Sequence, residues 1–211
     1  MYLPKQFDHR DPELTCALLR EHPLATLITL DEHGHPCLSH LPIKLDQTGP
    51  DGMPKLLLGH LARANPLADI QDGALVKLSV MGAHAYISPD WYETPEMVPT
   101  WNYLAVEGSG YVRHLSDAAL RKLLNDLTVQ EERLLTPKPP WTLARLSEAR
   151  LNQLLPSIAG FELVFDSLEG KAKLSQNRAQ ADIAGAVAGL EKRSDAASLA
   201  VATAMRKISL Q

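Results

Sequence analysis

Three short stretches of the sequence carry charged and polar side chains of the kinds that hold an anionic ligand. In the first, Gly59-His-Leu-Ala-Arg-Ala-Asn-Pro66, a strand pattern gives way to a helix pattern beside a basic residue, Arg63. Backbone N–H groups at a helix start and an arginine guanidinium both bind phosphate oxygens. The stretch therefore offers His60, Arg63 and Asn65 as candidate ligands. A helix start with a solvated arginine has the same pattern.

The second stretch, from Lys171 to Arg178, reads KAKLSQNR. Its three cations can hold an anion, and its hydroxyl and amide side chains can hydrogen-bond the donor–acceptor edge of a heterocycle. The candidate residues here are Lys171, Lys173, Ser175, Gln176, Asn177 and Arg178. An alternative interpretation makes Ser175 an ordinary helix N-cap and leaves Arg178 in solvent.

The third stretch, His40-Leu-Pro-Ile-Lys44, lies within a strand pattern. The alternation of side chains along a strand places His40, Pro42 and Lys44 on one side and the aliphatic residues on the other. Inside a barrel, Lys44 would need an anion or a carboxylate beside it. A solvent-facing strand side explains both charged residues equally well.

Aromatic residues are concentrated between His84 and Gly110, although they make up only 5% of the chain. Two of the three tryptophans and three of the five tyrosines fall in this stretch: Trp91, Trp101, Tyr86, Tyr92 and Tyr103. The prolines and the Ser88-Pro89-Asp90 segment around them are typical of turns. Flat rings between stiff turns form a wall for a planar ligand, or they are simply part of the core.

Hydrophobic periodicity predicts about seven strands and several helices that would position these stretches. The strands are expected at residues 24–30, 37–45, 55–59, 74–80, 83–88, 100–115 and 160–168. The helices are expected at residues 12–22, at 60–70, from Ser116 to a break at Thr136–Pro140, at 147–155, and after 178 with a split near Ser194. So many mostly antiparallel strands favour an α+β fold, a closed or half-closed barrel with helices attached.

Length and composition indicate one globular domain with a helical C-terminal extension. The 211 residues are 45% hydrophobic, and the net charge of −4 does not favour binding to nucleic acid. Cys16 and Cys37 lack metal-ligand spacing and are expected to be buried thiols in a reducing cytoplasm. No apolar run approaches the length of a membrane span, so we expect a soluble cytoplasmic protein.

The sequence motifs of several common chemistries are absent. Neither G-x-G-x-x-G nor G-x-x-x-x-G-K occurs, which disfavours a Rossmann domain and a P-loop. The eight histidines do not have the spacing of a metal site, and H-E-x-x-H is missing. There is also no G-x-S-x-G and no convincing Cys–His pair for nucleophilic catalysis. We therefore assign no catalytic residue and no metal ligand.

Six motifs in this order give the sequence a resemblance to a known family. They are Met1-Tyr-Leu-Pro4 with Phe7, Ser39-His-Leu-Pro42, Gly59-His60 with Ala62, Asn65 and Pro66, Ala85-Tyr-Ile-Ser-Pro-Asp-Trp-Tyr92, Val98-Pro-Thr-Trp-Asn-Tyr103, and Lys173-Leu-Ser-Gln-Asn-Arg178. Together they resemble the PaiB-like, FMN-binding negative transcriptional regulators of bacteria, from residue 1 to roughly residue 190. The last two motifs in this order are specific, whereas one short match alone would not be.

The resemblance implies a split β-barrel like that of the pyridoxamine-phosphate-oxidase-like flavoproteins, and a homodimer whose two subunits line the FMN clefts. In such proteins the FMN phosphate lies near the strand that enters the first short helix, which here implies Arg63 with Lys44 as a helper. It also implies flavin contacts from Thr100, Trp101 and Asn102, with residues 173–178 closing the site. We expect the FMN-binding domain at residues 1–178 and the helical extension at residues 179–211.

Four functions stay open on these grounds. The first is an FMN-dependent regulator or sensor, for which the acidic charge and the lack of a clear helix-turn-helix disfavour direct DNA binding. The second is a flavin reductase or oxidase, in which the flavin needs no dedicated acid or base from the protein. The third is a haem-binding split barrel with His40, His60 or His84 as axial ligand. The fourth is a dimeric scaffold with an empty cleft.

Overall fold

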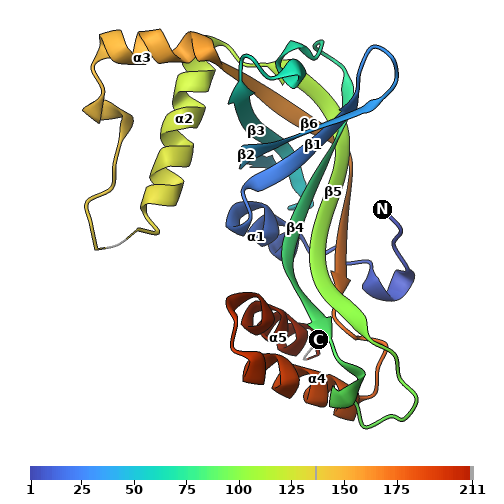
Figure 1. The fold of residues 1–211 in the computed structure, drawn as a ribbon. Helices are drawn as coiled ribbons and strands as arrows, with labels where there is room; N and C mark the ends of the chain where they lie inside the picture. The colour runs from blue at the N-terminus through green and yellow to red at the C-terminus, as the bar shows by residue number, and fades with distance from the viewer. Residues whose placement is uncertain (136, 210–211) are drawn as a thin grey trace. The chain divides into compact units, whose positions relative to one another are not determined.

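Six strands form a closed barrel in the computed structural model, which describes residues 1–135 and 137–209 (Figure 1). The strands are β1 (Leu24–Leu30), β2 (Pro36–Thr48), β3 (Pro54–Ala62), β4 (Leu75–Ile87), β5 (Thr100–His114) and β6 (Ile158–Lys173). Their order around the barrel is β1-β2-β3-β6-β5-β4. β1 pairs antiparallel with β2 and β4, and β3 pairs antiparallel with β2 and β6. The expected barrel with attached helices is therefore confirmed.

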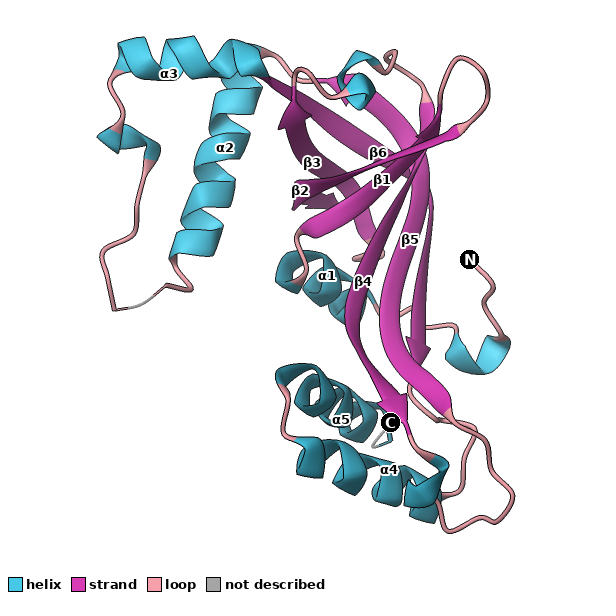
Figure 2. Cartoon of the chain, viewed as in Figure 1, coloured by secondary structure: helices cyan, strands magenta, loops and turns pink. Residues whose placement is uncertain are grey.

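Five α-helices and five short 3-10 segments accompany the strands in the described residues (Figure 2). The α-helices are α1 (Pro12–Glu21), α2 (Asp117–Glu132), α3 (Glu148–Leu154), α4 (Gln180–Arg193) and α5 (Ala196–Ser209). The 3-10 segments are η1 (Lys5–Phe7), η2 (Pro66–Asp69), η3 (Pro89–Trp91), η4 (Leu143–Arg145) and η5 (Leu155–Ser157).

Two expected helix ends are confirmed by local geometry. The Ser116 hydroxyl accepts a hydrogen bond from the Ala119 N–H at the start of α2, as an N-cap should. Ser194 separates α4 from α5 and has a left-handed φ of 57°, which ends a helix. The expected break after α2 includes Thr136, which lies outside the described residues.

The structure corrects several expected boundaries. The two strands expected at residues 74–80 and 83–88 are one strand, β4, so the described barrel has six strands and not seven. β3 continues through His60 to Ala62, and the segment expected as a helix at 60–70 is only the 3-10 segment η2, which begins at Pro66. Ser175 is not a helix N-cap, because α4 begins at Gln180 with Ala179 in that position.

The chain divides into two units. The first contains Met1–Asp11, Val80–Glu107 and the chain from Glu169 onward, and the second contains Pro12–Ser79 and Gly108–Leu168. Strands β4, β5 and β6 each contribute residues to both units. The domain boundary expected at residue 178 stays a prediction.

The core of the second unit includes the inward-facing residues of its strands together with buried leucines of α1 and α2. Along β1 and β2, Ala25, Leu27, Leu41 and Ile43 are each at most 1% exposed, while their neighbours in sequence are less buried. This alternation is the period of two that a strand with one buried face requires. Burying each such leucine or isoleucine contributes about 1.5–3 kcal/mol to stability.

In the first unit, α4 packs against α5 and against η3. The contact with η3 needs glycine on α4, because a Cβ at Gly189 would lie 2.3 Å from Trp91 Cδ2 and one at Gly185 would lie 1.9 Å from the Trp91 carbonyl oxygen. Two glycines four residues apart lie on one helix face, so they create a groove for the indole. Trp91 is therefore a packing residue.

Candidate ligand-binding site

An exposed group of three rings lies on β4 and β5 in the first unit. The Trp101 ring centroid is 6.0 Å from that of Tyr86, edge-on, and 6.2 Å from that of His84. Trp101 is 53% exposed and Tyr86 is 38% exposed, so neither ring is core. We call these three residues the aromatic ledge. The two rings thus have different surroundings: Trp91 is half-buried and packs against α4, and Trp101 faces outward.

The residue after Trp101 points to the opposite face of β5 and holds the segment after β6. Asn102 is fully buried, and its Nδ2 donates to the Ser175 hydroxyl at 2.9 Å. The hydroxyl in turn donates to Asn102 Oδ1 at 3.2 Å. Ser175 is buried and has a left-handed φ of 65°, a conformation that a non-glycine residue keeps only when its surroundings impose it.

Three basic residues of the first unit, Lys171, Lys173 and Arg178, form what we call the cation cluster. The Lys173 ammonium donates to the Thr100 hydroxyl at 2.6 Å. Burial, followed by the positive charges of Lys171 and Arg178, lowers the pKa of Lys173 below its usual value. The structure therefore brings Thr100 and Asn102 together with part of the 171–178 stretch, whereas the Trp101 ring contacts His84 and Tyr86.

The other two cations contact aromatic rings. Lys171 is 7% exposed, donates to the Tyr2 carbonyl oxygen at 2.9 Å and lies 5.2 Å from the Tyr103 ring centroid. The Arg178 guanidinium carbon lies 5.7 Å from the Tyr92 ring centroid. Both distances are within the range of cation–π attraction.

Gln176 and Asn177 have different surroundings from the cations beside them. Gln176 braces its own loop, because its Oε1 accepts from the Leu174 N–H at 2.7 Å and its Nε2 donates to the Ala172 carbonyl oxygen. Asn177 is exposed. Of the two amides, Asn177 is the one open to a ligand.

Asp182 in the first turn of α4 is a residue that the sequence analysis missed. It is 2% exposed and accepts hydrogen bonds from the Glu93 N–H at 2.9 Å, the Thr94 N–H at 3.0 Å and the Thr94 hydroxyl at 2.6 Å. The Thr94 hydroxyl is the main cause that holds the pKa of Asp182 below its usual value. Asp182 thus orders the loop between η3 and β5, and no local pattern predicts a contact across 89 residues.

In the second unit, Arg63 lies at the rim of a hollow of about 470 Å³ that Asp72 and His114 also line. Arg63 is exposed, and its Nη2 donates to the Ile158 carbonyl oxygen at 3.3 Å. His114 hydrogen-bonds the Ala68 carbonyl oxygen at 3.1 Å and Asp72 Oδ1 at 2.7 Å. Both bonds raise the pKa of His114, and the bond to the Ala68 carbonyl oxygen has the larger effect. The guanidinium of Arg63 is open to an anion, and its role as a phosphate ligand stays a prediction.

Asn65 and His60 are two further predicted ligands in this unit: Asn65 is already hydrogen-bonded, and the His60 Nδ1 is buried. Asn65 is the N-cap of η2: its Oδ1 accepts from the Leu67 N–H at 2.9 Å, and its Nδ2 donates to the Ser39 hydroxyl at 2.7 Å. The His60 Nδ1 is buried without a hydrogen-bond partner among the described residues. Burial lowers the pKa of His60, so its imidazole is held in the neutral form.

Lys44 lies on the side of β2 opposite the buried residues and has two carboxylate neighbours. Its ammonium lies 3.4 Å from Asp126 Oδ2 on α2 and 3.5 Å from Asp46 Oδ1. Leu41 and Ile43 are buried on the opposite side of the strand, as alternation predicts. Lys44 already has two anionic partners, so its help with a phosphate stays a prediction.

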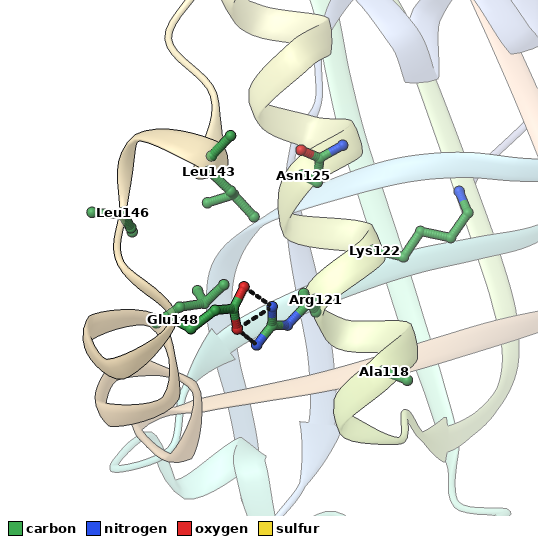
Figure 3. A pocket seen from close by; sticks show the side chains of 9 residues that line it. Ala118, Arg121, Lys122, Asn125, Leu143, Leu146 and Glu148 are labelled. Carbon is green, nitrogen blue, oxygen red and sulfur yellow. Dashed lines mark hydrogen bonds and ion pairs between the residues drawn. The ribbon is translucent and has the colours of Figure 1, made fainter.

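A hollow of about 570 Å³ lies between α2, η4 and α3 in the second unit (Figure 3). Arg121 on α2 faces Glu148 on α3 and donates to both of its carboxylate oxygens at 2.9 Å. The same guanidinium donates to Asn152 Oδ1 at 3.0 Å. Arg121 is therefore used to hold α3 on α2, and none of the residues predicted from the sequence lines this hollow.

The described residues contain neither a metal-binding group nor a membrane-spanning helix. No group of three or more His, Cys, Asp or Glu side chains among them is arranged to hold a metal ion. No helix within residues 1–135 and 137–209 is long and apolar enough to cross a membrane.

Comparison with solved structures supports the fold. The FAD- and haem-binding protein of Mycobacterium smegmatis has a similar structure, with a TM-score of 0.58 over 84% of this chain and 78% of that protein. The sequences are only 20% identical, so this likeness concerns the barrel architecture alone.

Comparison with sequence families and relatives identifies the family. Residues 1–167 match the family described as "Putative FMN-binding domain". The protease synthase and sporulation protein PAI 2 of Bacillus subtilis is 31% identical over 90% of this chain and 89% of its own length. An uncharacterised protein of Emericella nidulans, AN0679, is 28% identical over 98% of this chain and 97% of its own length, so such sequences also occur in fungi. The chain therefore belongs to the PaiB-like family, which shares this FMN-binding domain.

Proposed function

We propose that this protein binds FMN, with the isoalloxazine ring of the flavin against the aromatic ledge. The observation that carries the proposal is the 53% exposure of Trp101, an indole that packing alone would bury. Its place beside Tyr86 and His84 gives a flat ligand more than one ring to contact. A bound flavin supplies hydride and electron transfer, and the protein supplies its binding and orientation.

The residues present fit such a ligand in two respects. The ledge offers an apolar surface, and ring stacking contributes about 0.5–1.5 kcal/mol beyond the area that it buries. The cation cluster lies in the same unit and offers charge of the sign that a phosphorylated ligand needs. Thr100 contacts the cluster through Lys173 but projects to the face of β5 opposite Trp101. Tyr103, two residues after Trp101 and so on its face of β5, has its ring 5.2 Å from the Lys171 ammonium.

The test is a fluorescence titration of the ligand-free protein with FMN. We expect Trp101→Ala to weaken FMN binding by about tenfold or more, which corresponds to a loss of roughly 1.4 kcal/mol. Trp141→Ala is the matched control, since Trp141 lies outside the ledge, next to Glu132, and its loss should leave FMN affinity unchanged. Equal FMN affinity in all three proteins would refute the placement of the flavin.

We further propose that the protein is a homodimer that uses the outer face of the barrel. Leu24, Leu30, Leu38 and Leu75 on β1, β2 and β4 are 58–67% exposed, and we call them the leucine face. Strand alternation turns all four outward, because their neighbours Ala25, Leu27 and Val76 are buried. A large apolar patch on a monomer is typical of an interaction surface.

Light scattering after size exclusion tests this dimer. The wild-type protein should have twice the 23.2 kDa mass of one chain, and Leu38→Glu combined with Leu75→Glu should give the single-chain mass. Leu134→Glu is the control, because Leu134 is 75% exposed but lies outside the barrel strands. A wild-type protein of single-chain mass would contradict the proposal.

We also propose a regulatory role in the cytoplasm, in which the bound flavin makes the protein a sensor. The two cysteines are free, which is consistent with a reducing compartment. The net charge of −4 does not favour direct binding to DNA. Gel-shift assays at several salt concentrations against promoter fragments test this, and salt-dependent, sequence-specific retardation would overturn the expectation that DNA is not bound directly.

A haem-binding role is the second candidate, and the buried, unpartnered Nδ1 of His60 favours it. Since burial keeps this imidazole neutral, it has the protonation state that iron ligation requires. The visible spectrum of the purified protein separates the two candidates. FMN or FAD gives flavin absorption, with the released cofactor identified by mass, whereas haem gives a Soret band.

A further inference from the structure

The charges of the cation cluster are not balanced by ion pairs with carboxylates in the described part of the chain. Among the described residues, none of Lys171, Lys173 and Arg178 forms an ion pair with a carboxylate, although most other basic residues with contacts in this chain do so. Lys171 is only 7% exposed, and Lys173 and Arg178 are half-buried. Protein interiors seldom hold several cations without an anion nearby.

The surroundings of the cluster make this imbalance costly. Lys173 is half-buried, and burial together with the positive charges of Lys171 and Arg178 lowers the pKa of its ammonium. The Asp182 carboxylate, which feels the charge of Arg178, forms no ion pair with it in the described residues and accepts hydrogen bonds from Glu93 and Thr94. An anion of another molecule would relieve the repulsion that the protein itself leaves unrelieved.

Several donors near these cations are also unused. The Lys173 ammonium has three N–H donors, and in the described residues one of them is used, on the Thr100 hydroxyl. The polar contact of the Arg178 guanidinium is a 3.6 Å approach to the Met97 sulfur, a weak acceptor. The hydroxyl of Tyr92, whose ring lies under Arg178, is buried without a hydrogen-bond partner among the described residues.

We propose that Lys173 and Arg178 bind a phosphate-type oxyanion, with Lys171 supporting them by its charge. A tetrahedral oxyanion accepts several N–H and O–H donors at once, which matches an ammonium, a guanidinium and the Thr100 hydroxyl. The anion is either the phosphate of FMN, in which case this site rests on the proposed function, or free phosphate. The site differs from the one at Arg63 that the sequence resemblance implies.

Calorimetric titration of the full-length, ligand-free protein with inorganic phosphate tests the site. We expect Lys173→Met and Arg178→Met each to weaken phosphate binding by about tenfold or more, and Lys173→Arg to retain most of it. Lys5→Met is the control, since Lys5 is an exposed lysine of the same unit. Circular dichroism of each variant confirms that it is folded.

A parallel titration with FMN and with riboflavin, which lacks the phosphate, identifies the source of the anion. If the cluster holds the FMN phosphate, Lys173→Met lowers FMN affinity and leaves riboflavin affinity unchanged. If phosphate binds but FMN and riboflavin do not, the oxyanion site stands and the flavin proposal fails. If phosphate affinity and the ratio of FMN to riboflavin affinity are the same in wild type and Lys173→Met, the oxyanion site is refuted.

Discussion

The buried pair of Asn102 and Ser175 should be one of the most energetically coupled contacts in the first unit. It joins the strand that carries Trp101 to the loop that carries the cation cluster, across 73 residues of sequence. Both side chains are at most 4% exposed, so water cannot replace either partner when the other is removed. Asn102 also contacts the Met205 sulfur at 3.4 Å, so α5 shares the same amide.

The loss of stability on removing either side chain can be estimated from the contacts that it makes. Asn102→Ala removes the hydrogen bonds to Ser175, leaves a buried hydroxyl unpaired and opens a small cavity, for about 2–4 kcal/mol of lost stability. Ser175→Ala leaves the Asn102 amide short of a partner and should cost about 1–3 kcal/mol. Serine and alanine have a similar energetic penalty at the left-handed φ of 65°, so the backbone strain of residue 175 nearly cancels between wild type and Ser175→Ala.

A double-mutant cycle measured by urea unfolding, followed by circular dichroism, is the appropriate assay. We expect the double variant to lose less stability than the sum of the two single variants, by about 1–2 kcal/mol. Asn177→Ala is the control, because Asn177 is exposed and its loss should change stability by less than about 0.5 kcal/mol. If the two substitutions are additive within about 0.5 kcal/mol, the direct contact does not exist in solution.

Three other perturbations have defined outcomes. Gly189→Ala places a methyl group 2.3 Å from the Trp91 ring, and thermal unfolding should report a loss of about 1–3 kcal/mol; unchanged stability would contradict the packing of Trp91 on α4. Lys44→Met should lower the free energy of unfolding by less than about 1 kcal/mol in the same assay. Asp126 would still be paired with Lys122, which is the larger cause of the lowered pKa of Asp126. A larger loss would mean that Lys44 holds β2 to α2 by itself. The folded-state pKa of His114 is raised above its usual 6.5, first by its bond to the Ala68 carbonyl oxygen and then by its bond to Asp72. The stability that these two bonds add is therefore complete below pH 6.5 and is lost as the pH rises through the raised pKa. Amide exchange of residues 68–72 should accelerate as the pH rises through this range beyond its intrinsic increase, and Asp72→Asn should reduce the extra acceleration without removing it, because the bond to Ala68 remains; identical profiles for both proteins would exclude a part for Asp72.

Much of the fold follows from local patterns in the sequence. The alternation around Leu41–Ile43 predicts that these residues share one side of the strand and Lys44 the other, and the structure confirms that division. Which face of Leu24–Leu30 is buried could not be read from its pattern, because Leu24 and Leu30 are exposed while Ala25 and Leu27 are buried. The Ser116 cap depends on residues within one helical turn, so sequence is sufficient to find it. Another exception is β4: Gly82 is typical of a strand break, but β4 runs through it because Gly82 is buried within the barrel strand.

The candidate site could be predicted only in part, because its contacts join distant parts of the chain. Trp91 and Trp101 belong to the same aromatic stretch, but Gly185 and Gly189 on α4 decide that Trp91 is packed. The contacts of Asp182 with Glu93 and Thr94 depend equally on tertiary packing. The residue types of the 171–178 stretch did indicate an anion site, whereas the lack of carboxylate partners required the structure.

A crystal structure of the protein with FMN would show where the flavin lies. We expect the isoalloxazine ring to contact the Trp101 indole, with ring atoms about 4 Å apart. FMN bound elsewhere, with Trp101 still open to solvent, would contradict it.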